Sequence, residues 1–206
     1  MWAPPTGRHL TEEKNTIMRT ALRTMAATTA TAALTLTLAA SLATTATAAG
    51  IGVTDPNDTS HGSDLRSVQV KHGRDNVKVI TTHENLRRDP ASGSGGVVYL
   101  DTDPDDDGPE FALVGGYFVG TDYQLVATEG FGQKKWGQPV EFGDYRMTIN
   151  YAKEHVRTQI SRAAIGDPDE VRVAIRVSGT RTDGTSHGLV DWLGESRSFT
   201  EWVARG

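Results

Sequence analysis

Alternation of apolar and polar residues is the feature that most constrains the fold of this chain. In the stretch EVRVAIRVS, apolar residues occupy every second position from Val171 to Val177, with two arginines on the opposite face. Successive side chains of a β-strand point to opposite faces, so this pattern predicts a strand with one buried face. Similar patterns begin at Val77, Gly96, Glu110, Asp122, Asp144 and His155.

Turn signals rich in Gly, Pro, Asp and Asn separate these stretches. They occupy residues 72–76, 89–95, 120–122, 167–168 and 182–184. Many short strands at such spacing, without a long helical period, predict an all-β fold with a single antiparallel β-sandwich domain. We expect one helical turn in the SRAAIG stretch that starts at Ser161.

The first 48 residues have the pattern of segments that are not part of the folded domain. Residues 1–17 precede a second methionine and indicate an over-long gene start. Residues 18–48 combine a basic start, an uncharged Ala/Thr/Leu stretch and the small residues Ala46-Thr47-Ala48, the layout of a secretory signal peptide. A membrane anchor is the alternative, but a span needs about twenty predominantly apolar residues, and Ala and Thr dominate here. We therefore expect cleavage after Ala48 and an extracellular, monomeric β-sandwich domain over residues 49–206 without a membrane anchor.

Charge and cysteine content exclude several classes of protein. Cleavage would remove four of the 21 basic and two of the 26 acidic residues, which leaves a formal charge of −7. An acidic domain without a basic stripe repels phosphate, so we expect no nucleic-acid partner. The absence of cysteine excludes disulfides, a thiolate nucleophile and a Cys-based zinc site. Stability must then come from the core or from a bound ion.

Six carboxylates crowd into the ten residues from Asp101 to Glu110, directly after a predicted strand. The spacing before Gly108 matches the first half of an EF-hand loop, but Val114 stands where that loop needs a glutamate. Alternate carboxylates on a tight loop can still converge on calcium. The alternative is a solvated hairpin loop shaped by proline and glycine. If an ion binds here, its predicted ligands are Asp101, Asp103, Asp105 and Asp107.

A second acidic segment, TDPNDTSHGSDL, contains Asp55, Asp58 and Asp64. By itself it is typical of a loop rich in Asx turns. Its D-x-x-D…G…D-L pattern resembles the opening of β-sandwiches related to family 9 carbohydrate-binding modules and DOMON domains. The stretch ISRAAIGDPDEVRVAIRV resembles their late strand, helical turn and following strand. This resemblance implies a structural calcium ion held by the three aspartates.

The chain also resembles small secreted actinobacterial proteins of unknown function. The motifs LDTDP…GPEF, GTDYQL and DW…FTEWVARG carry this resemblance over nearly the whole predicted domain. It implies a secreted β-sandwich and no established activity.

One tryptophan is a candidate for ligand binding. Trp136 lies in the Gly-rich stretch GFGQKKWGQP beside Lys134 and Lys135. An exposed Trp ring can stack on a sugar, whereas the alternative is a ring that folds back onto the sandwich. Trp192, Phe199 and Trp202 are expected to be core residues of a closing strand.

Motifs for catalysis are missing from the sequence. No G-x-S-x-G elbow and no H-E-x-x-H zinc motif occurs. A glycosidase needs two facing carboxylates, but so many acidic residues make the presence of a pair uninformative. We therefore expect a secreted non-catalytic binding or envelope-associated module, with polysaccharide as the favoured ligand. The alternatives are a secreted hydrolase with unidentified carboxylates, or a protein-interaction or inhibitor module.

Overall fold

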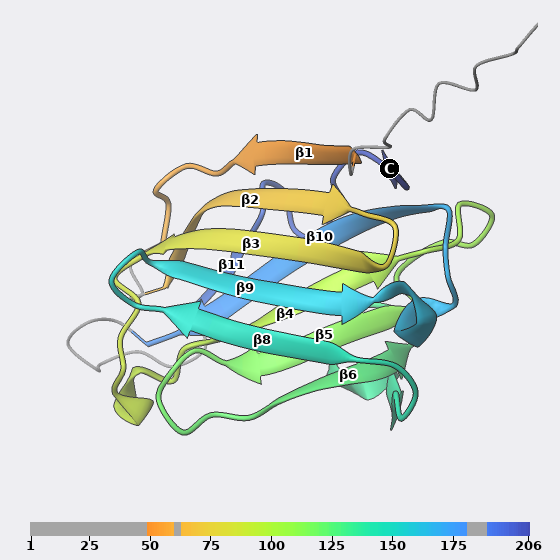
Figure 1. Cartoon of the computed structure of the whole chain (residues 1–206). Helices are drawn as coiled ribbons and strands as arrows, with labels where there is room; N and C mark the ends of the chain where they lie inside the picture. The colour runs from red at the N-terminus through yellow and green to blue at the C-terminus, as the bar shows by residue number, and fades with distance from the viewer. Residues whose placement is uncertain (1–48, 60–62, 181–188) are drawn as a thin grey trace, which may run out of the picture. The chain divides into compact units, whose positions relative to one another are not determined.

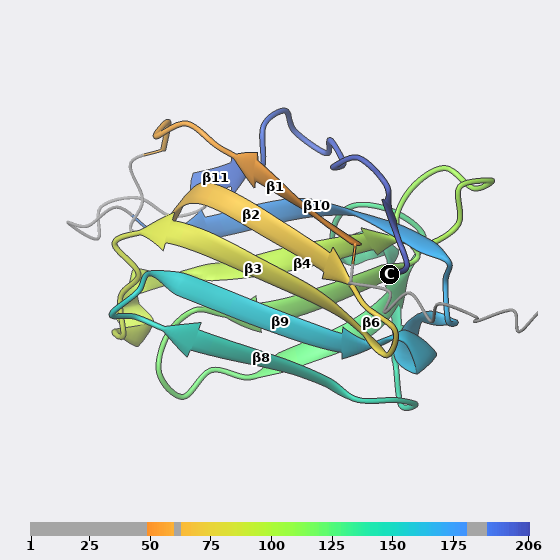
Figure 2. The same cartoon turned by 45° about the horizontal axis from the view of Figure 1, so that its top comes forward.

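The alternating segments form two antiparallel sheets that pack face to face, so the predicted β-sandwich is confirmed (Figures 1 and 2). The computed structural model describes residues 49–59, 63–180 and 189–206. The predicted gene start and signal peptide, residues 1–48, lie outside the described residues. The first strand begins at Ala49.

One sheet has five strands in the order β1-β2-β3-β9-β8 and lies nearest the viewer in Figure 1. Its strands are β1 (Ala49–Thr54), β2 (Asp64–His72), β3 (Asn76–Glu84), β8 (Tyr145–Asn150) and β9 (His155–Ser161). The second sheet has the order β11-β10-β4-β5-β6-β7, with β12 paired to β10. Its strands are β4 (Gly95–Asp101), β5 (Phe111–Gly116), β6 (Tyr123–Thr128), β7 (Trp136–Pro139), β10 (Glu170–Gly179), β11 (Leu189–Trp192) and β12 (Val203–Ala204).

Helical structure in the described residues is limited to three short 3₁₀ segments, η1 (Pro90–Ser92), η2 (Gln133–Lys135) and η3 (Arg162–Ile165). The η3 segment is the helical turn expected after Ser161. None of the helices in the described part of the chain has the length and hydropathy to cross a membrane.

The main core lies between the sheets and follows the alternation of the sequence. In β10, Val171, Val173, Ile175 and Val177 are all fully buried. Each such side chain contributes about 1.5–3 kcal/mol relative to an exposed one. Inward-facing residues of the facing strands β2, β3 and β9 complete this core, among them Val68, Val79 and Ile160.

A second, smaller apolar cluster covers the outer face of the seven-stranded sheet. We call it the outer-face cluster; its buried members are Val97, Tyr99, Ala112, Val126 and Ala174. Half-buried aromatic residues pack on it, namely Phe131, Trp136, Trp192 and Phe199. Trp192 and Phe199, predicted to be core residues of a closing strand, pack on this outer-face cluster and not between the sheets, because the alternation of β11 turns Trp192 outward.

Candidate metal site

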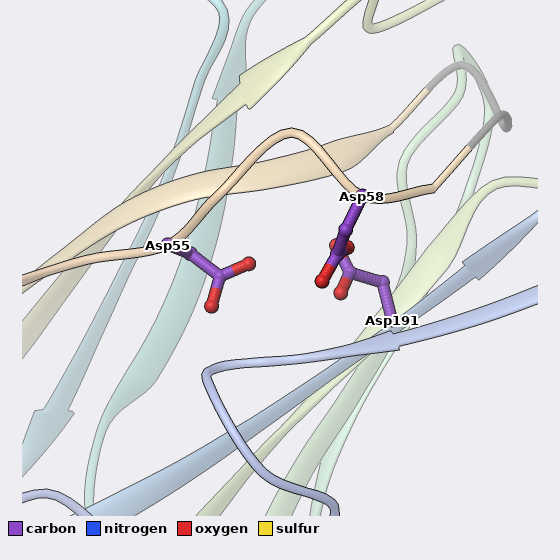
Figure 3. A group of neighbouring side chains, drawn as sticks. All are labelled: Asp55, Asp58 and Asp191. Carbon is purple, nitrogen blue, oxygen red and sulfur yellow. The ribbon is translucent and has the colours of Figure 1, made fainter.

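Three aspartates that are far apart in the sequence lie together at one end of the sandwich. Asp55 and Asp58 lie on the loop after β1, and Asp191 lies in β11 (Figure 3). Each carboxylate offers an oxygen, and these oxygens all lie within 4.8 Å of one another. We call these three residues the aspartate triad.

Strand pairing explains why Asp191 faces inward. Its backbone pairs with Val177 in β10, and alternation along β11 puts Asp191 on the face opposite Trp192. Only 3% of Asp191 is exposed. The Asp55 N–H donates to the Arg66 carbonyl at 3.0 Å, which extends the pairing of β1 with β2 by one residue. Asp55 thus continues the alternation of β1 on its inward face, and only 6% of it is exposed.

Backbone N–H groups donate hydrogen bonds to only some of the carboxylate oxygens of the triad. The Leu65 N–H donates to Asp191 Oδ2 at 2.7 Å, and the Gly194 N–H donates to Asp55 Oδ1 at 2.6 Å. Asp55 Oδ2 is buried and has no hydrogen-bond partner. A buried carboxylate oxygen without a partner costs on the order of 1–3 kcal/mol or more, so this atom requires a compensating group.

Electrostatics of the triad favour a cation. Burial, opposed by the Leu65 hydrogen bond and reinforced by the neighbouring carboxylates, raises the pKa of Asp191 to about 7. Burial also raises the pKa of Asp55, although the Gly194 hydrogen bond opposes the shift. Within the described residues, no basic side chain forms an ion pair with Asp55, Asp58 or Asp191. The triad could therefore hold a metal ion that neutralises it.

Asp64, the third aspartate predicted in this region, is placed beside the triad but outside it. Its Oδ1 accepts hydrogen bonds from the Thr59 N–H (3.0 Å) and the Thr59 hydroxyl (2.8 Å). Its Oδ2 is 3.3 Å from the Arg66 guanidinium. Asp64 is thus already compensated and shapes the loop that carries Asp58.

Asp191 was not predicted as a site residue. It lies more than 130 residues further along the chain, so no sequence motif links it to Asp55 and Asp58. The signal that could have found it is an acidic residue at an inward position, between Leu189 and Leu193, in an alternating stretch.

The crowded acidic loop after β4 is organised differently. Asp101 is fully buried, and its Oδ2 accepts from Arg172 Nε at 2.7 Å and Nη2 at 2.6 Å. Asp103, Asp105 and Asp107 are exposed, and Asp103 Oδ1 accepts from the Asp105 N–H in a local turn. Among the described residues, the acidic loop forms no group of carboxylates as close as the aspartate triad. Calcium binding in this loop stays a prediction.

Trp136 is less exposed than a free loop residue would be. It begins β7, is half-buried on the outer-face cluster, and its indole Nε1 is buried without an acceptor. Trp136 lines two cavities, of about 380 and 330 Å³. Lys134 and Lys135 are exposed in η2, directly before it.

Comparison with known proteins adds no family to this description. No protein-family model matches the chain, and no curated protein matches it. The resemblance to carbohydrate-binding and DOMON-like sandwiches therefore stays a prediction.

Proposed function

We propose that the protein is a secreted, calcium-stabilised β-sandwich that acts as a non-catalytic binding module for a polysaccharide. The observation that carries the calcium assignment is Asp55 Oδ2, a buried carboxylate oxygen without a hydrogen-bond partner. It belongs to a triad with which no basic side chain of the described residues forms an ion pair.

The position of the triad supports a structural role for the ion. Asp55 and Asp58 follow β1 of the five-stranded sheet, whereas Asp191 belongs to β11 of the seven-stranded sheet. An ion bound by all three would connect the two sheets at this end of the sandwich. In a domain without cysteine, such a link takes the place that a disulfide has in many secreted proteins.

Calcium fits better than magnesium. Calcium accepts six to eight oxygen ligands at variable angles, whereas magnesium requires a near-ideal octahedron and retains its waters. The triad combines two buried carboxylates with an exposed one, which leaves room for water on one side. Extracellular calcium modules bind with dissociation constants of about 10⁻⁴–10⁻³ M, and a site with three carboxylates suits that range.

A catalytic role is the second candidate, because a carboxyl group with a raised pKa beside another carboxylate is typical of a general acid. Burial argues against it. Asp55 and Asp191 are almost fully enclosed, so a polymeric substrate has little access to their oxygens. The same burial suits a structural ion.

The binding role is supported by the surface of the seven-stranded sheet. Half-buried aromatic side chains, among them Trp136 and Trp192, lie beside the two cavities described above. Aromatic rings with one accessible face are common platforms for sugars.

Calorimetric titration tests the calcium part. Calcium added to chelator-treated protein should bind at one ion per chain and more tightly than magnesium. Asp55→Asn should abolish binding, whereas Asp103→Asn in the exposed acidic loop is the control and should not. A wild type that binds no calcium would refute this assignment.

A glycan array tests the binding part, and a hydrolase panel on the same preparation tests the absence of catalysis. Retention of a polysaccharide without its cleavage is the expected result. Cleavage that is lost in Asp191→Asn would favour the catalytic role instead.

A further inference from the structure

The smaller of the two cavities beside Trp136 has an unusual combination of walls. Aromatic rings line it together with two guanidinium groups, those of Arg176 and Arg197. Its remaining lining residues are Tyr99, Phe131, Gly132, Gln133, Trp136 and Trp192, none of which is acidic.

The aromatic wall is held in place by its own contacts. The rings of Tyr99 and Trp192 are nearly parallel, with an interplanar angle of 11° and centroids 6.1 Å apart. Phe131 packs edge-on against both rings. The Tyr99 hydroxyl accepts a hydrogen bond from the Gly132 N–H at 3.1 Å, which fixes the loop that carries Phe131. A rigid wall of this kind reduces the entropy that a ligand loses on binding.

Arg176 in β10 and Arg197 in the segment after β11 differ from Arg172, which also belongs to β10. Arg172 is neutralised by Asp101 and stacks on Phe199 and Trp202, with its Cζ 4.7 and 4.6 Å from the ring centroids. Across the described residues, the side chains of Arg176 and Arg197 form no hydrogen bond or ion pair. An acidic protein thus leaves two positive charges uncompensated beside an aromatic cavity.

We propose that this cavity binds an acidic saccharide, in which a uronate carboxylate pairs with Arg176 and Arg197 while the sugar ring packs against the aromatic wall. This inference rests on the proposed polysaccharide-binding function and specifies its ligand class. The planar guanidinium group suits a carboxylate because it donates two parallel hydrogen bonds.

The arrangement around Trp136 favours an oligomer over a single sugar. The larger cavity also has Trp136 in its lining, together with Gln124 and Asp122. Asp122 would repel a carboxylate there, so the charged sugar is expected at the arginine side and its neighbour at the Gln124 side.

Calorimetry with a matched pair of ligands tests the inference. The probes are tetra-galacturonate and its full methyl ester, which have the same chain length but differ in charge. The protein variants are Arg176→Gln/Arg197→Gln and, as a control, Arg157→Gln, which lines a cavity on the other sheet. Low ionic strength keeps the charges unscreened.

We expect the acid form to bind at least about tenfold more tightly than the ester, since one hydrogen bond to a charged group is worth a factor of this order. The double variant should bind the acid form as weakly as the ester, and Arg157→Gln should match the wild type. Because the ligand pair is compared on the wild type, a double variant that fails to fold does not remove the test.

Three results would overturn the inference, and they separate it from the proposed function. Equal binding of acid and ester would refute recognition of charge and leave polysaccharide binding intact. If the protein bound neither ligand and no other glycan on the array, both the inference and the proposed polysaccharide-binding function would be refuted. If sodium sulfate bound the cavity as tightly as the acid tetramer and displaced it, the cavity would be a simple anion site.

Discussion

Asp191→Asn should stabilise the protein in chelator and remove its response to calcium. The substitution keeps the shape of the side chain and an oxygen that accepts the Leu65 N–H, but it removes one charge from the aspartate triad. The same charge destabilises the ion-free protein and binds the ion, so one variant tests both properties.

The size of the effect follows from burial and distance. Raising the pKa of Asp191 from 3.8 to about 7 corresponds to about 4 kcal/mol of unfavourable free energy when the group is ionised. Two like charges at the 4.8 Å limit of the triad repel by about 3 kcal/mol at an effective dielectric constant of about 20. The variant should therefore gain about 2–4 kcal/mol at pH 8 in chelator, a rise in Tm of about 4–16 °C.

Calcium should act on the wild type alone. At a hundredfold excess over its Kd, the ion adds about 2.7 kcal/mol to the free energy of unfolding of the wild type. The difference in stability between the variant and the wild type should therefore decrease by that amount. Scanning calorimetry at pH 8, in chelator and in calcium, measures both differences.

Asp101→Asn is the matched control, because Asp101 is equally buried but is neutralised by Arg172. It should lower stability by the same amount in chelator and in calcium. The reasoning would be refuted if Asp191→Asn destabilised the protein in chelator while the wild type melted at the same temperature in both buffers. Asp191 would then be a protonated structural hydrogen-bonding group.

Three further outcomes are expected, two from the structure and one from the sequence. In chelator, the stability contributed by the raised pKa of Asp191 is fully present below pH 4 and is lost as the pH rises through about 7, so Tm should fall over this window in the wild type and not in Asp191→Asn. Asp103→Asn combined with Asp105→Asn should change stability by less than about 0.5 kcal/mol, since both side chains are exposed, and should leave the calcium-induced rise in Tm unchanged; loss of that rise would place the ion in the acidic loop. N-terminal sequencing of protein from the culture supernatant should begin at or near Ala49, and recovery of uncleaved chain in the membrane fraction would contradict export.

The strands and the helical turn could be predicted from the sequence because their signals are local. A strand buries every second side chain, so the residues from Val171 to Val177 reveal their own conformation without reference to any partner. The turn at η3 is similarly predicted by the stretch SRAAIG and by the Asp167-Pro168 pair that follows it. Two of the three triad members, Asp55 and Asp58, were implied as metal ligands only by the resemblance of a short acidic motif to the opening of other β-sandwiches.

The site itself was decided by tertiary structure. Asp191 joins Asp55 and Asp58 only because β11 pairs with β10 at the edge of one sheet, opposite the loop that leaves β1 of the other. Asp101, which sequence proximity grouped with the acidic loop, is instead opposite Arg172 in the register of β4 and β10. The order of residues along a chain determines which side chains share a strand face. Which faces and edges meet depends on the pairing of distant strands, and that pairing determines whether a buried carboxylate lies beside an arginine or beside other carboxylates.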